Sequence, residues 1–121
     1  MQKTILVVND SSLTTRIICT SLQKEGFITI PALDGKDAIP LLDKYNFDLV
    51  ITDLNMPEMD GIQLTKQIRA HKNHKYIPVL FLSGNESNDK TKEAKEAGSS
   101  AWISMPYDAK KMLIAINKFL R

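Results

Sequence analysis

Two aspartates stand where parallel strands would bring carboxylates together. Asp10 follows the apolar run 5–8, and Asp53 follows the apolar run 47–52. If these runs form neighbouring parallel strands, their carboxyl ends lie at one edge of the sheet and the two side chains converge. Two carboxylates suit Mg²⁺, which binds few protein oxygens and keeps several of its waters. A carboxylate can also act as a nucleophile and form an acyl phosphate.

Further residues that could do chemistry stand at or near the ends of other apolar runs, and each also has an ordinary explanation. Ser83 follows the run 77–82 and offers a hydroxyl donor to a phosphoryl oxygen, although Ser-Gly is also a common turn. Trp102 lies in the run 101–104, where a tryptophan is more often buried than functional. A single aspartate at a strand end most often caps a loop or a helix, so only the pair points to chemistry.

The remaining polar residues are expected at the surface. His71 and His74 flank Asn73 on a polar stretch, and we expect both to be exposed to solvent. The alternating lysines and glutamates of residues 90–96 are typical of a solvated helix face.

The elements that must hold these residues alternate in type along the chain. Five short apolar runs predict strands at residues 5–8, 27–30, 47–52, 77–82 and 101–104. Five amphipathic segments predict helices at residues 11–25, 36–45, 62–71, 89–97 and 108–120. Nearly continuous apolar runs are typical of strands that are buried on both faces. We therefore expect an α/β fold with a doubly wound, five-stranded parallel sheet and right-handed crossovers.

Two of the predicted helices have unusual sequences. Pro40 falls within the second one, so we expect that helix to start late, near Lys36, or to bend. The fourth helix has only a thin apolar side, formed mainly by Ala94 and Ala97. Such weak anchoring suits an element that shifts between two packings.

Length and composition favour one domain over residues 1–121. Of the 121 residues, 43% are hydrophobic, which is enough for a buried core. The net charge of +2 is too small to predict binding to nucleic acid or to a membrane surface. Cys19 is the only cysteine, which excludes an internal disulfide. No apolar run is long enough to span a membrane and no signal peptide starts the chain, so we expect a cytoplasmic protein.

The segment Asp53–Gly61 is the most specific motif in the chain. Its sequence, DLNMPEMDG, resembles the phosphoacceptor loop of the receiver domains of two-component response regulators. The resemblance covers essentially the whole chain and includes the stretch 32–35, Ser83 and Trp102. The form it resembles is the single-domain, chemotaxis-type receiver. This implies the flavodoxin-like (βα)5 fold with strand order 2-1-3-4-5.

The resemblance implies roles for five residues. Asp53 matches the aspartate that accepts a phosphoryl group. Asp10, Asp53 and the backbone carbonyl of Asn55 match the ligands of Mg²⁺. Ser83 matches the residue that turns toward the phosphoryl group, and Trp102 occupies the place of the aromatic side chain whose rotamer follows that movement.

The resemblance also implies a function and partners. The protein would be a signalling switch and not an enzyme, phosphorylated by a histidine kinase or a phosphotransfer protein. It would change its binding to an unknown output protein through the face formed by the fourth helix, the fifth strand and the fifth helix. Direct binding to nucleic acid or to a membrane is not expected.

Two positions depart from the family pattern. Asn9 stands where the family has a first acidic residue, and Met105 stands where it has a lysine before Pro106. Neither replacement keeps the charge, and methionine offers no strong hydrogen-bond donor. One lost negative charge and one lost positive charge leave the formal charge of the pocket unchanged, which favours a coupled replacement.

Other functions fit some of the same residues. A degenerate receiver that binds partners independently of phosphorylation would explain both departures. An aspartyl-phosphate phosphohydrolase also uses an aspartate nucleophile and Mg²⁺, but it carries the nucleophile after its first strand in an Asp-x-Asp pattern, whereas the motif here follows the third strand. A flavin-binding protein would need a phosphate-binding loop rich in Ser, Thr and Gly after the first strand, which the sequence lacks.

Overall fold

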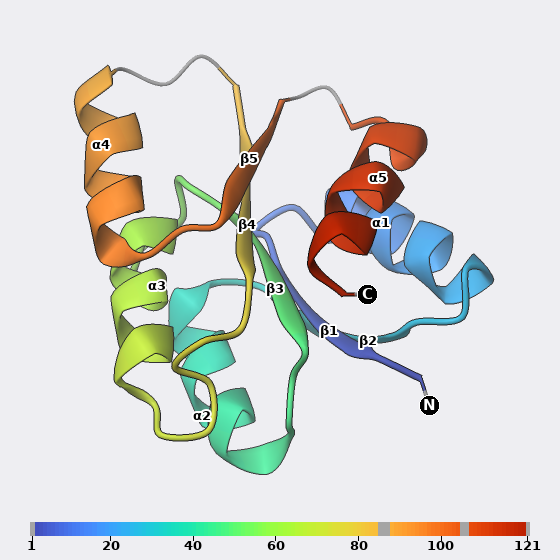
Figure 1. Cartoon of the computed structure of the whole chain (residues 1–121), viewed down its shortest axis with the longest axis horizontal. Coiled ribbons are helices and arrows are strands. Elements are labelled where there is room, and N and C mark those ends of the chain that lie inside the picture. Colours follow the sequence, from blue (N-terminus) through green and yellow to red (C-terminus); the bar gives the residue numbers. More distant parts are fainter. Residues whose placement is uncertain (1, 85–87, 105–106, 121) are drawn as a thin grey trace.

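The computed structural model describes residues 2–84, 88–104 and 107–120, which form a five-stranded parallel sheet covered by helices (Figure 1). The strands are β1 (Thr4–Val8), β2 (Ile28–Ala32), β3 (Leu49–Asp53), β4 (Val79–Ser83) and β5 (Ala101–Ser104). The helices are α1 (Ser12–Lys24), α2 (Gly35–Lys44), α3 (Gly61–Ala70), α4 (Asn88–Ala97) and α5 (Ala109–Phe119). The strand order is β2-β1-β3-β4-β5, so the expected doubly wound fold and its strand order are confirmed.

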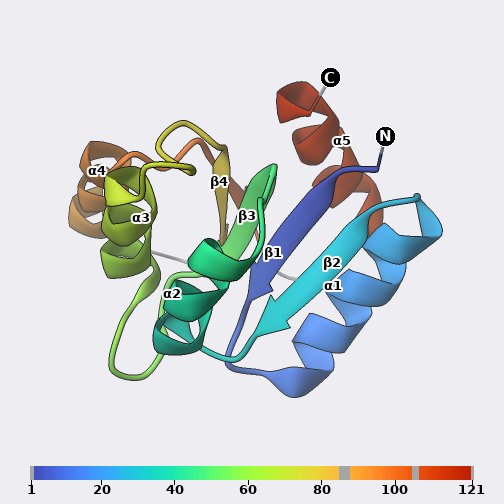
Figure 2. The same cartoon turned by 90° about the horizontal axis from the view of Figure 1, so that it is seen from below.

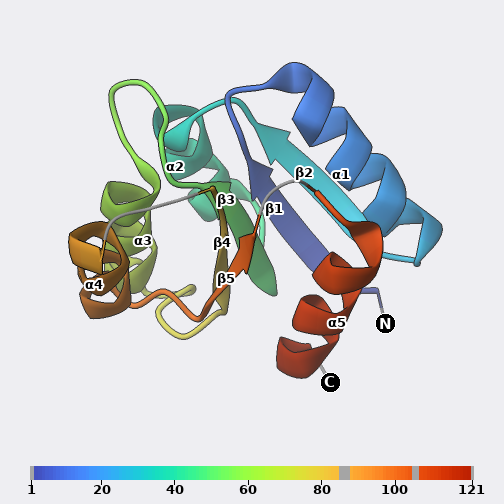
Figure 3. The same ribbon diagram turned by 90° about the horizontal axis from the view of Figure 1, so that it is seen from above.

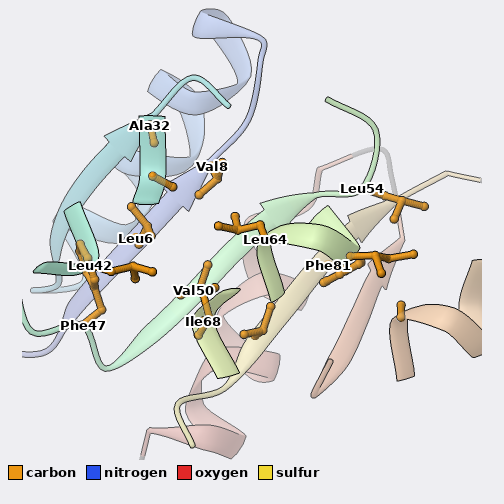
Figure 4. Close-up of a cluster of buried hydrophobic side chains, with 14 residues drawn as sticks. Leu6, Val8, Ala32, Leu42, Phe47, Val50, Leu54, Leu64, Ile68 and Phe81 are labelled. Atoms are coloured by element: carbon orange, nitrogen blue, oxygen red, sulfur yellow. The ribbon is translucent and has the colours of Figure 1, made fainter. Parts of the chain in front are cut away.

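The helices cover the sheet in two groups. Figures 2 and 3 show α1 and α5 on one face of the sheet and α2, α3 and α4 on the other. Successive side chains of a strand point to opposite faces. Ile5 and Val7 of β1 therefore belong to the core under α1 and α5, whereas Leu6 and Val8 belong to the core on the other face, which is shown in Figure 4. Burial on both faces explains why β1, β3 and β4 are apolar without alternation, whereas the edge strand β2 is mostly exposed or half-buried.

A capping hydroxyl and a glycine mark the two ends of α1. The hydroxyl of Ser11 accepts a hydrogen bond from the N–H of Thr14 at 3.2 Å, as expected for an N-cap. Beyond the helix, Gly26 has a φ of +91°, a left-handed conformation that glycine adopts without strain.

The helix α2 begins one residue before the late start that was expected near Lys36. Asp34 caps the helix by accepting the N–H of Asp37 at 2.7 Å, so α2 begins at Gly35 and does not start late. Pro40 lies inside the helix at an exposed position, and the hydrogen bond that an N–H would donate there is missing.

The thin apolar side of α4 is confirmed, and a guanidinium group adds to its attachment. Ala94 is buried and Ala97 is half-buried. Arg69 of α3 donates to the carbonyl of Gly98 at 2.6 Å, just beyond α4, and to two carbonyls of the segment 75–77. Burial lowers the pKa of Arg69, but a guanidinium stays charged in proteins. A positive charge at the carboxyl end of a helix is favourable, so Arg69 holds this end of α4 to α3.

The expectation that both histidines are exposed is wrong. His74 is 1% exposed, and His71 is half-buried. Nε2 of His74 accepts the N–H of Phe47 at 3.1 Å, so the His74 proton sits on Nδ1, which lies 3.1 Å from Nδ1 of His71. Nε2 of His71 lies 2.8 Å from Oδ1 of Asp43. This polar chain joins the carboxyl ends of α2 and α3 to the segment before β3.

The folded protein should lose stability in acid because of His74. Burial, and then the nearby His71, lower the pKa of His74, while the Asp43 carboxylate and the Tyr45 carbonyl act in the opposite direction without outweighing burial. Below the ordinary histidine pKa of about 6.5, the unfolded chain therefore binds a proton that the folded chain does not. The contribution of His74 to the free energy of unfolding is complete above about pH 6.5. Below that pH the free energy of unfolding falls, by up to about 1 kcal/mol per pH unit.

Urea unfolding at about pH 7.5 and about pH 5.5 measures this effect. The wild-type protein should lose more stability between the two conditions than His74→Gln, whose amide can still accept the N–H of Phe47 but does not titrate. Lys72→Gln, at an exposed position, is the matched control and should behave like wild type. The same loss in His74→Gln as in wild type would contradict the role of His74.

Candidate functional site

The pairing of β1 with β3 brings together the two strand ends that carry the polar residues. Val8 pairs with Thr52, so the next residues, Asn9 and Asp53, stand side by side. Each lies two positions beyond a residue of the core under α1 and α5, Val7 for Asn9 and Ile51 for Asp53, so their side chains share that face of the sheet. Asp10 follows directly and is exposed. The expected convergence of the Asp10 and Asp53 carboxylates requires this register, because it sets the ends of β1 and β3 side by side.

The carboxylate of Asp53 is oriented by the backbone N–H of the next residue, Leu54. Its Oδ1 accepts the N–H of Leu54 at 2.8 Å, and the residue is half-buried. Thr52 before it is fully buried, and its hydroxyl donates to the carbonyl of Asp53 at 2.9 Å. Asp53 is therefore fixed in position and still reachable from solvent.

The loop after Asp53 returns to it through Gly61. The N–H of Gly61 donates to the carbonyl of Leu54 at 2.8 Å. A Cβ atom on residue 61 would lie 2.5 Å from the carbonyl oxygen of Asp53, which is too close for any side chain. Asp60 and Gln63 close the start of α3 with reciprocal hydrogen bonds of 2.8 and 3.0 Å. This close approach explains the glycine at the end of the motif.

The start of α2 packs against the same loop. A Cβ atom on Gly35 would lie 2.9 Å from the carbonyl oxygen of Met59. Glu58 has a φ of +64°, which is uncommon for a residue other than glycine or asparagine, and its carboxylate lies 3.5 Å from the Lys36 ammonium in an exposed ion pair. Exposed ion pairs contribute little to stability, so the backbone contact of Gly35 is the more important one. Apart from the glycine itself, no sequence pattern indicated this contact.

The oxygens of Asp10, Asp53 and Asn55 fit the preferences of Mg²⁺. All three residues offer hard oxygen ligands, and both Asp10 and Asn55 are exposed. Within the described residues, no group of three or more His, Cys, Asp or Glu could hold a metal ion. Mg²⁺ needs no such group, because it binds through one or two carboxylates and keeps several waters.

The aromatic residue of β5 lies beside the sheet core. Trp102 pairs with Phe81 of β4, the centroids of their rings are 5.1 Å apart, and Trp102 is half-buried. Ser83 ends β4, but its side chain, Met105 and Pro106 lie outside the described residues. The roles expected of Ser83 and Met105 therefore stay predictions.

Comparisons with known proteins show the family. A family model of the response regulator receiver domain matches residues 5–117. This chain belongs to the response regulator receiver family. The receiver is 39% identical to the chemotaxis protein CheY of Pseudomonas aeruginosa over 115 residues, which cover 94% of this chain and 93% of the relative. The resemblance inferred from the motif is therefore confirmed for the family as a whole.

Solved structures agree with the fold of this receiver. The chemotaxis protein CheY4 of Vibrio cholerae matches with a TM-score of 0.95 and 30% identity, over 99% of this chain and 100% of that one. The receiver domain of the sensor histidine kinase PA1611 of Pseudomonas aeruginosa, described with a magnesium ion coordinated in its active-site cleft, matches with a TM-score of 0.90. Its identity of 22%, over 99% of this chain and 98% of that one, shows the fold alone.

Within the described residues of the receiver, no helix is both long enough and apolar enough to cross a bilayer.

Gly61→Ala should destabilise the receiver and displace Asp53. The added methyl group meets the Asp53 carbonyl and has to push the backbone aside, which costs about 1–3 kcal/mol. Urea unfolding checks the loss. Gly84→Ala is the control, because a Cβ there meets no atom of the described residues within 4 Å. A loss for Gly61→Ala no larger than that of the control would contradict the close approach.

Proposed function

We propose that this receiver is a phosphorylation-controlled switch that accepts a phosphoryl group on Asp53. The observation that carries the proposal is the place of Asp53 at the end of β3, beside Asn9 and close to Asp10 in the strand register, with one carboxylate oxygen held by Leu54. A half-buried, oriented carboxylate at the carboxyl edge of a parallel sheet is a suitable nucleophile. Membership of the receiver family supports the same role for Asp53.

In this transfer, a carboxylate oxygen of Asp53 attacks the phosphorus atom of a phosphohistidine on a histidine kinase or phosphotransfer protein. The P–N bond breaks, its electron pair returns to the imidazole nitrogen, and an acyl phosphate forms on Asp53. Asp10, Asp53 and the backbone carbonyl of Asn55 would hold Mg²⁺. When bound, the ion would supply positive charge to the phosphoryl oxygens. The magnesium described for the PA1611 receiver supports this assignment.

The output surface would be the face formed by α4, β5 and α5, with Ser83 and Trp102 relaying the phosphorylation state. A groove of about 510 Å³ runs between β5 and α5 and is lined by Trp102, Ile114, Phe119 and the two lysines 111 and 118. Because Trp102 lines this groove and also contacts the aromatic ring of β4, a change of its rotamer would alter the groove. The partner would be a protein segment; the small net charge of the chain gives no support for nucleic acid or a membrane.

A receiver that binds its partner without phosphorylation is the second candidate. Asn9 and Met105 favour it, because they replace an acidic residue and a lysine of the family pattern. Loss of phosphorylation with retained partner binding would be its signature.

Asp53 should take up one phosphoryl group from a small phosphodonor in the presence of Mg²⁺, because its carboxylate is the nucleophile. Intact-protein mass spectrometry measures the product, which should be absent from Asp53→Asn. Asp37→Asn, at an exposed position in α2, should be phosphorylated like wild type. A wild-type protein that stays unmodified at saturating Mg²⁺, or equal modification of Asp53→Asn, would favour the second candidate.

Mg²⁺ affinity should depend chiefly on Asp10. Replacing a carboxylate ligand with a neutral side chain removes both charge and a ligand atom, so Asp10→Ala should weaken binding by at least about tenfold. Asn9→Ala should have a much smaller effect. Trp102 fluorescence or calorimetry follows the titration. Similar losses in the two variants would contradict Asp10 as the direct ligand.

A further inference from the structure

Asn9 is almost completely buried at the end of β1, with an exposed fraction of 5%, and all but one of its hydrogen-bonding groups have partners. Its N–H donates to the carbonyl of Ala32 at 3.1 Å, and its carbonyl accepts from the hydroxyl of Thr15 at 3.3 Å. Its side-chain oxygen accepts the N–H of Ser11 at 2.8 Å. The side-chain amide nitrogen is the group that is left, and it donates no hydrogen bond within the described part of the chain.

The bond from Ser11 fixes the direction of this nitrogen. A backbone N–H can only donate, so the amide oxygen of Asn9 must face Ser11 and the nitrogen must face away from it. Among the described residues, only Tyr107 has a side-chain oxygen or nitrogen that is both fully enclosed and without a partner. The Asn9 nitrogen therefore keeps access to solvent, at the open edge of the sheet where Asp53 shares its face and register.

We infer that the side-chain amide of Asn9 donates a hydrogen bond to the phosphoryl group on Asp53. The inference rests on the proposed function of Asp53 and adds a residue that binds the transferred group. Neighbouring strands lie about 4.8 Å apart, so the oxygens that an acyl phosphate adds to Asp53 come within reach of the amide. The amide nitrogen has no acceptor among the described residues, and a charged phosphoryl oxygen is a stronger acceptor than a neutral group. Phosphorylation would therefore satisfy Asn9 and be stabilised by it.

An aspartate at position 9 would act differently. One of its oxygens could keep the bond from Ser11, but the second would place negative charge where the Asn9 nitrogen lies. The asparagine thus replaces an acceptor with a donor next to the phosphoryl site. This chain also has methionine at position 105, where the family pattern has a lysine, so Asn9 would supply a donor in addition to Ser83 that the missing lysine cannot.

NMR on the ¹⁵N-labelled wild-type receiver tests the inference directly. The probe is beryllofluoride, a phosphoryl analogue that attaches to the carboxylate, added in saturating Mg²⁺. The side-chain amide signals of Asn9, assigned by their absence from Asn9→Ser, should shift, and their exchange with solvent should slow by about tenfold. The side-chain amide of Asn46, exposed in the loop before β3, should do neither.

Two variants distinguish the effect of the Asn9 amide donor from the effect of the charge at position 9. Asn9→Ser keeps a hydroxyl that can accept the N–H of Ser11 but loses the amide. Its affinity for beryllofluoride should fall by about tenfold, while its affinity for Mg²⁺ stays within about twofold of wild type. Asn9→Asp should bind Mg²⁺ more tightly and beryllofluoride less tightly. Thermal unfolding by circular dichroism confirms that each variant is folded.

The outcomes distinguish this inference from the proposed function. Asn9 amide signals that stay in place while the backbone signals of Asp53 and Leu54 shift would overturn the role of Asn9 and leave Asp53 as the acceptor. A parallel loss of Mg²⁺ and beryllofluoride affinity in Asn9→Ser would indicate a merely structural role and also overturn it. A receiver in which no signal responds to beryllofluoride would refute the proposed function, and the role of Asn9 with it.

Discussion

The parallel pairing of β1 with β3 is the constraint on which the candidate site depends. Both strands are covered on both faces, and their apolar residues from Ile5 to Val8 and from Leu49 to Ile51 have no exposed surface. A slip of one residue would bring the carboxylate of Asp48 or of Asp53 into the buried part of the sheet, so burial fixes the register. The register that sets Val8 beside Thr52 also sets Asn9 beside Asp53. The hydrophobic core therefore decides which polar residues meet at the edge of the sheet.

Two glycines allow the close main-chain contacts that hold the loop beyond Asp53 against the rest of the fold. Gly61 lets α3 begin against the carbonyl of Asp53, and Gly35 lets α2 begin against the carbonyl of Met59. Backbone contacts of this kind leave no room for adjustment, whereas the exposed ion pair of Lys36 with Glu58 is weak. The loop is thus held by close packing of main chain, and the Asp53 carboxylate is oriented by Leu54 within it.

The sequence predicted the fold well, because continuous apolar runs and capping residues are local signals. It predicted which residues stand at the strand ends, and the register follows from the same runs. It was less informative where burial depends on distant parts of the chain. Leu13 and Ile17 have the spacing of a buried helix face, yet they are 68% and 47% exposed because α1 lies over the sheet with its other apolar residues. His74 is buried against Phe47, 27 residues away, and no local pattern reports such a contact.

The proposed switch depends on Asp53 as the carrier of the phosphoryl group, at the edge of the sheet where β1 and β3 end. A crystal structure of the receiver with Mg²⁺ and beryllofluoride tests it most directly. We expect beryllofluoride bonded to a carboxylate oxygen of Asp53, with Mg²⁺ bound to Asp10, Asp53 and the carbonyl of Asn55. A structure in which Mg²⁺ or beryllofluoride binds elsewhere, or in which the Asp53 carboxylate stays unmodified at saturating concentrations of both, would contradict it.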